Sequence, residues 1–198
     1  MTVIKHKQQR IGIFIDTQNL YHSAKNLYKA KVNFATILDD AIADRQLIRA
    51  IAYVISTESG DEKAFFEALG KIGIETKTKE LQVFWGGAKK ADWDVGLAVD
   101  TIKMAPRLDT IIIASGDGDF VPLVEFLQIN MGVQVEILAF GKSASGKLRE
   151  AADDFLDLST NPERYLIGTG RRRHSAVVAD AQTPDEGEPT SGKKVVTL

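Results

Sequence analysis

Cysteine is absent from the 198-residue chain, which excludes disulfides, thiol nucleophiles and thiolate-bound zinc. The three histidines, His6, His22 and His174, show no ligand spacing, which disfavours a zinc hydrolase. No apolar run reaches the ~18 residues of a membrane-spanning helix, and the N-terminus lacks an apolar segment of signal-peptide length. We therefore expect a cytoplasmic protein without membrane contact.

Apolar residues make up 44% of the chain and charged residues 26%, as in soluble globular domains. Short runs rich in isoleucine and valine are nearly continuous rather than alternating, which is typical of strands buried on both faces of a parallel sheet. These runs span residues 11–15, 50–56, 110–115 and 133–140. A weaker, alternating run from residue 74 indicates an edge strand or a hairpin-like excursion.

Amphipathic helical patterns separate the apolar runs. They span residues 20–28, 34–43, 62–72, 95–104, 120–131 and 145–152. This alternation predicts an α/β fold, a three-layer α/β/α sandwich around a central, mainly parallel sheet. We expect an N-terminal extension over residues 1–9, one domain over residues 10–160 and a flexible tail over residues 161–198, where the composition shifts to Gly, Pro, Ser, Thr and charge.

Acidic residues follow two of the predicted strands directly. Asp16 comes after the first strand, and Asp117 and Asp119 come after the strand at residues 110–115. The carboxyl ends of parallel strands are where open α/β sheets bind ligands. A third acidic group, which includes Asp94 and Asp100, lies at the start of the fourth predicted helix. Taken singly, these residues are also ordinary turn and helix-capping residues.

The acidic motifs contain no arginine or histidine that would offset their mutual repulsion. Carboxylates suit Mg²⁺, with Mn²⁺ as an alternative, and paired Mg²⁺ ions promote phosphodiester cleavage. The sequence does not match other phosphate-binding or hydrolytic motifs. The segment before GKSASGK has Glu136 where a Walker A motif needs glycine, and neither G-x-G-x-x-G after the first strand nor G-x-S-x-G is present.

Together, IDTQNL, KKADWDVGLAVD, IIIASGDGDFVPLVEFL and MGVQVEILAF resemble the NYN domain. More narrowly, they resemble its LabA-like branch, within the PIN-like nuclease superfamily. The resemblance covers roughly residues 10–159. It implies an acidic, Mg²⁺-binding pocket and nuclease activity, mostly on RNA. The residues that it assigns to catalysis and metal binding are Asp16, Asp94, Asp117 and Asp119, with Asp100 as a further metal ligand.

Substrate-binding residues are predicted around these acids. The resemblance implies that Asn19 orients Asp16 or the substrate. Ser115 is a candidate to donate a hydrogen bond to a phosphate or a carboxylate. Binding of the substrate needs basic residues around the rim of the acidic site. Lys89 and Lys90 are candidates, and so are Lys142 and Lys147 after the last predicted strand. Trp93 either stacks on a base or packs under the neighbouring loop.

The sequence therefore predicts a Mg²⁺-dependent ribonuclease, an (endo)ribonuclease that acts on single-stranded RNA, and leaves open whether it cuts within the strand or from an end. The alternatives are a non-catalytic nucleic-acid-binding or regulatory module of the same fold and a small-molecule phosphoesterase; a homodimer is left open. The formal net charge of −2 includes five candidate site acids, so the rest of the chain carries +3. The mild acidity of the chain is therefore compatible with a nucleic-acid substrate.

Overall fold

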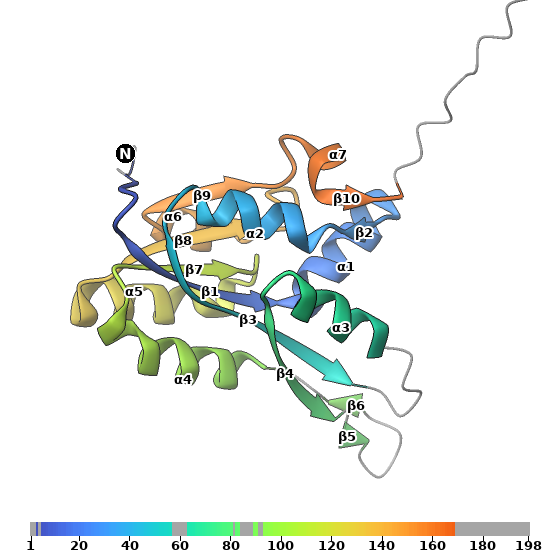
Figure 1. Ribbon diagram of the computed structural model, residues 1–198, viewed down its shortest axis with the longest axis horizontal. Helices are drawn as coiled ribbons and strands as arrows, with labels where there is room; N and C mark the ends of the chain where they lie inside the picture. The colour runs from blue at the N-terminus through green and yellow to red at the C-terminus, as the bar shows by residue number, and fades with distance from the viewer. Residues whose placement is uncertain are drawn as a thin grey trace, which may run out of the picture.

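Six parallel strands form the central sheet in the order β4-β3-β1-β7-β8-β9 (Figure 1). The structure is a computed structural model, and it describes residue 3 and residues 5–56, 63–80, 82–83, 89–90 and 93–168. The strands of this sheet are β1 (Arg10–Asp16), β3 (Gln46–Ser56), β4 (Glu75–Glu80), β7 (Thr110–Ala114), β8 (Gln134–Ala139) and β9 (Asp154–Asp157).

Helices cover both faces of the sheet, as Figure 1 shows. One face carries α1 (Thr17–Tyr28), α2 (Phe34–Ile42) and α3 (Lys63–Lys71). The other carries α4 (Asp94–Met104), α5 (Val121–Met131) and α6 (Gly146–Ala151), with the short 3-10 helices η1 (Ala105–Arg107) and η2 (Gly118–Phe120). The predicted three-layer α/β fold is confirmed.

The central strands are apolar on both faces because each face packs against helices. In β1, Ile13 and Ile15 belong to the core beneath α1, α2 and α3, whereas Phe14 belongs to the core beneath α4 and α5. In β7, Ile112 and Ile113 divide between the two cores in the same way. This double burial explains why the isoleucine-rich runs are continuous rather than alternating.

The chain reverses its direction across the sheet between β1 and β7. From β1 it proceeds outward through β3 to β4, and from β7 it proceeds outward the other way through β8 to β9. The connections that leave β1 and β7 therefore diverge to opposite faces: β1 continues into α1, and β7 leads through η2 into α5. Such a switch point leaves a crevice at the carboxyl ends of the two strands, where ligands bind in open α/β sheets.

Two small antiparallel pairs complete the described structure. One joins β5 (Gln82–Val83) and β6 (Lys89–Lys90), and the other joins β2 (Lys31–Val32) and β10 (Leu166–Ile167), which follows α7 (Pro162–Tyr165). Residues 162–167, expected in the flexible tail, are thus paired and packed, with Tyr165 buried. Among the described residues, no helix is long and apolar enough to cross a membrane.

Candidate active site

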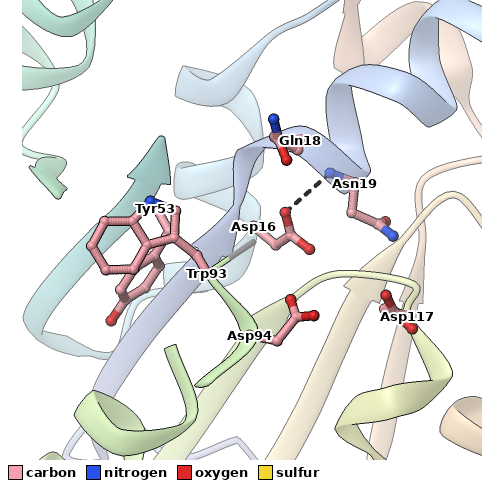
Figure 2. Close-up of a pocket in the computed structure, with 7 residues that line it drawn as sticks. All are labelled: Asp16, Gln18, Asn19, Tyr53, Trp93, Asp94 and Asp117. Atoms are coloured by element: carbon pink, nitrogen blue, oxygen red, sulfur yellow. Dashed lines mark hydrogen bonds between the residues drawn. The ribbon is translucent and has the colours of Figure 1, made fainter. Parts of the chain in front are cut away.

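A pocket of about 180 Å³ lies at the carboxyl ends of β1 and β7, at the switch point of the sheet. Figure 2 shows that carboxylates reach it from three elements: the end of β1, the start of α4 and the loop after β7. Its lining residues are Asp16, Gln18, Asn19, Tyr53, Trp93, Asp94 and Asp117. The structure therefore brings together Asp16, Asp94 and Asp117, which the sequence predicted as site residues.

Asp16 ends β1 and caps the N-terminus of α1. Its Oδ1 accepts a hydrogen bond of 3.1 Å from the backbone N–H of Asn19, and its Oδ2 accepts one of 3.1 Å from the hydroxyl of Ser115. Burial raises the pKa of Asp16, an effect that these hydrogen bonds oppose and the nearby charge of Asp117 reinforces. The hydrogen bonds that Asp16 accepts from Asn19 and Ser115 come from neutral donors, so neither of them offsets the negative charge of the carboxylate.

Ser115 links the acids of the two strands. Its side chain is fully buried, and its Oγ accepts a 3.2 Å hydrogen bond from the backbone N–H of Asp117 while donating to Asp16. Of the two partners predicted for Ser115, a phosphate or a carboxylate, the structure shows a carboxylate, that of Asp16. Ser115 therefore fixes the position of Asp117 relative to Asp16.

Asn19 joins α1 to the loop after β7. Its Oδ1 accepts a 2.9 Å hydrogen bond from the backbone N–H of Gly116, and its own N–H bonds to Asp16. A side chain at Gly116 would be crowded, because a Cβ there would lie 3.0 Å from the Cα of Ala144. Asn19 therefore contacts Asp16 through its backbone, whereas its side chain holds the loop after β7 and lines the pocket. That the Asn19 side chain orients Asp16 or the substrate stays a prediction.

Trp93 and Tyr53 form the wall of the pocket beside Asp94 (Figure 2). Their rings lie 5.4 Å apart, and the Trp93 indole donates a 2.9 Å hydrogen bond to the backbone oxygen of Val54. The indole also covers Gly96, where a Cβ would approach it to 2.5 Å. Trp93 is therefore packed and hydrogen-bonded, and only part of it faces the pocket.

Two of the predicted acids lie away from the pocket lining. Asp100 accepts hydrogen bonds from Lys77, at 2.6 Å, and from the Tyr53 hydroxyl, at 3.0 Å. Its partial burial would raise its pKa, but these two partners outweigh burial and lower it. Asp119 is exposed, and its backbone N–H donates to the Asp117 carboxylate at 3.0 Å. The proposed roles of Asp100 and Asp119 as metal ligands thus lack support from their positions.

The remaining predictions for the site concern metal ligands and cations. Within the described part of the chain, no group of three or more His, Cys, Asp or Glu side chains is arranged to hold a metal ion. The side chains of Lys89 and Lys90 lie outside the described residues, although their backbone forms β6. Lys142 and Lys147 are exposed.

Two pocket residues, Gln18 and Tyr53, were not among the predicted site residues. Tyr53 reaches the site because the parallel register of β1 and β3 pairs it with Asp16. Burial, followed by its hydrogen bond to Asp100, raises the pKa of Tyr53, so it remains a protonated donor at neutral pH. A polar aromatic residue within the otherwise aliphatic run of β3 was the available signal.

The comparisons with known proteins place this pocket in a family. The model of the NYN domain matches residues 10–159, a segment that contains every residue of the pocket lining. The chain belongs to the NYN domain family. The low amplitude and bright protein LabA of Synechococcus elongatus is 25% identical to it over 189 residues, which cover 90% of this chain and 98% of LabA. The predicted resemblance is therefore confirmed.

A solved structure shares the architecture of this NYN domain. It is the crystal structure of a protein of unknown function from Vibrio parahaemolyticus, which is 28% identical to the chain. The match covers 83% of this chain and 100% of the other, with a TM-score of 0.75. The likeness extends over the sheet and its helices and supports the α/β fold described above.

Proposed function

We propose that this NYN domain is a Mg²⁺-dependent ribonuclease that hydrolyses phosphodiester bonds of single-stranded RNA. The observation that carries the proposal is the convergence of Asp16, Asp94 and Asp117 in one pocket at the switch point of the sheet. Neighbouring carboxylates repel one another unless a cation compensates them. A divalent cation bound among these carboxylates would offset that repulsion.

The residues present fit Mg²⁺ better than a metal that needs a closed protein cage. Mg²⁺ keeps several water ligands and binds through one or two carboxylates together with substrate phosphates. The pocket offers carboxylates from three elements and open volume for water and phosphate, without a preformed cluster of three ligands. Of Asp16, Asp94 and Asp117, one or two would hold the ion directly and the rest through its water ligands. When bound, Mg²⁺ supplies positive charge that polarises the phosphate and stabilises the leaving oxygen.

The protein groups around the acids would fix the geometry of the reaction. Ser115 and Asn19 hold Asp16 and the loop after β7 in place, so little reorganisation is needed when the substrate binds. The wall of Tyr53 and Trp93 offers aromatic surface beside the acids, suited to the base or sugar next to the scissile phosphate. RNA as substrate rests on the resemblance of the acidic motifs to nucleases of the family.

The proposal is tested by cleavage assays with Mg²⁺ on single-stranded RNA, single-stranded DNA and p-nitrophenyl phosphate. We expect RNA cleavage that EDTA abolishes and that Asp117→Asn reduces by roughly 10²–10³-fold, the range for losing one electrostatic stabiliser. Asp44→Asn is the matched control because it removes the same charge from a side chain that is 82% exposed. Asp44 lies near the start of β3 and therefore at the edge of the sheet opposite the pocket.

Three results would contradict the proposal. RNA cleavage that persists in Asp117→Asn at the wild-type rate would remove the pocket from the mechanism. Binding of RNA without cleavage would instead indicate a binding or regulatory module. Cleavage of p-nitrophenyl phosphate alone would indicate a small-molecule phosphoesterase.

A further inference from the structure

The exposed face of α1 begins at the pocket and leads away from it. Gln18 and Asn19, in the first turn of α1, line the pocket. One turn further, Tyr21 is 46% exposed, its ring lies 5.5 Å from the ring of His22, and the ammonium of Lys25 lies 5.5 Å from the Tyr21 ring centroid. An exposed aromatic ring with a cation over it therefore lies next to the site.

The loop between β8 and α6 runs beside α1 and brings Lys142 to Tyr28, seven residues or about two turns beyond Tyr21. The Ser143 hydroxyl donates to the Ser23 hydroxyl at 2.9 Å, and the Lys142 ammonium lies 5.5 Å from the centroid of the Tyr28 ring. The same loop is tied to the pocket because the backbone N–H of Ser145 donates to the Gly116 oxygen at 2.9 Å. These contacts hold α1, the loop and the pocket rim in one fixed arrangement.

The surface carries charge of one sign. Neither α1 nor residues 140–148 contain an acidic residue. The Asp157 carboxylate, which accepts a hydrogen bond of 2.8 Å from the Gly141 N–H of this loop, is paired with Arg149 at 3.2 Å. The α1 surface, as we call it, consists of exposed side chains only: Tyr21, His22, Lys25, Lys29 and Lys142.

We propose that the α1 surface binds the stretch of single-stranded RNA that leads into the pocket. Tyr21 stacks on an unpaired base, and Lys25, Lys29 and Lys142 contact the phosphates. Single-strand binding surfaces combine a cationic track with aromatic rings on which bases stack. The helix is about 18 Å long, enough for several nucleotides. The inference rests on the proposed function, since it assigns the path of that substrate.

Single-stranded RNA suits this surface better than a duplex or an acidic protein. A base that is paired and stacked in a duplex does not present its face to a lone ring, whereas an unpaired base does. An acidic protein would use the lysines but would have no specific use for the ring of Tyr21. The dependence of binding on the aromatic ring is therefore the decisive property to measure.

Binding is measured separately from cleavage, in the Asp117→Asn background, by fluorescence anisotropy of a labelled RNA oligomer of about 10 nucleotides. We expect Tyr21→Ala to weaken binding at least about 5-fold, while Tyr21→Phe, which keeps the ring, binds like its parent. Lys25→Ala and Lys142→Ala should each lower the slope of log K against log salt by about 0.7, the value for one phosphate contact on a single strand.

The control is Lys103→Ala, which removes an exposed lysine of α4 on the other face of the sheet. If Tyr21→Ala and Lys142→Ala bind RNA as tightly as this control, the proposed path along α1 is wrong. Metal-dependent cleavage by the wild type would in that case still support the proposed function. Binding that depends on Tyr21 without any wild-type cleavage would support the path and contradict the proposed function. A wild type that neither binds nor cleaves RNA overturns both.

Discussion

The Ser115 hydroxyl is the smallest group whose removal should disturb the site, and Ser115→Ala is the corresponding perturbation. The hydroxyl makes two hydrogen bonds, one of 3.1 Å to the Asp16 carboxylate and one of 3.2 Å from the Asp117 N–H. A bond to a charged group contributes about 1.5–3 kcal/mol and a neutral one about 0.5–1.5 kcal/mol. We therefore expect the variant to lose about 2–4 kcal/mol of unfolding free energy at neutral pH.

The loss should depend on pH in a defined direction. Burial raises the folded-state pKa of Asp16 above its ordinary value of 3.8, and the bond from Ser115 opposes that rise. Without the hydroxyl the folded-state pKa rises further, so ionisation of Asp16 costs more stability as the pH rises above 3.8. Below that pH Asp16 is protonated in both states, and the difference between variant and wild type shrinks.

The assay is urea unfolding of wild type and Ser115→Ala at neutral pH and again at about pH 4, near the ordinary pKa of aspartate. Ser56→Ala serves as the matched control, because among the described residues its hydroxyl makes a long bond of 3.5 Å to the Lys79 oxygen. We expect its unfolding free energy to change by no more than about 0.5 kcal/mol. A loss in Ser115→Ala no larger than in the control, or a loss of equal size at both pH values, would refute the reasoning.

Three further changes concern charged groups. Arg45→Met should lower the unfolding free energy measured in urea by about 1.5–3 kcal/mol. The buried Glu136 carboxylate loses the bonds of 2.6 and 3.0 Å from Arg45 but keeps the Lys5 ammonium at 3.3 Å and the Gln134 amide at 2.6 Å; an equally stable variant would contradict this. Because burial raises the pKa of Asp16, Asp16→Asn should raise the unfolding free energy at neutral pH, and this gain should disappear below pH 3.8. The same variant should lose RNA cleavage. Arg10 lowers the pKa of Asp109 to about 2. The small, salt-screened stabilisation by this pair should therefore be present above pH 3.8 and fade toward pH 2. It is measured as the difference in unfolding free energy between the wild type and Asp109→Asn at each pH.

The sheet was predictable because its central strands have a pattern that few other structures share. The runs that became β1 and β7 are apolar on both faces, which requires helices above and below. The end of the domain was harder to predict. The four-residue α7 has little intrinsic helix signal, and it is held by long-range contacts, among them the 2.8 Å hydrogen bond from the Tyr165 hydroxyl to Asp40. Such contacts leave no periodicity in the sequence.

The residues of the candidate site were likewise predictable only in part. Asp16 and Asp117 were predictable because each directly follows a buried strand, so the fold itself brings them together. Asp100 was not, since its position depends on the partners of α4, Lys77 and Tyr53, which are distant in the sequence. Tyr53 reaches the pocket through the register between β1 and β3, which the local sequence does not encode.

The most direct measurement of the central claim is a Mg²⁺ titration of single-turnover cleavage of single-stranded RNA. We predict that Asp94→Asn needs at least about 10-fold more Mg²⁺ for its half-maximal rate, in line with the 10–100-fold losses seen when a metal site is disturbed. The Asp44→Asn titration should superimpose on that of the wild type. Cleavage that proceeds unchanged in EDTA, or an Asp94→Asn titration identical to the wild type, would contradict a metal-dependent nuclease site in this pocket.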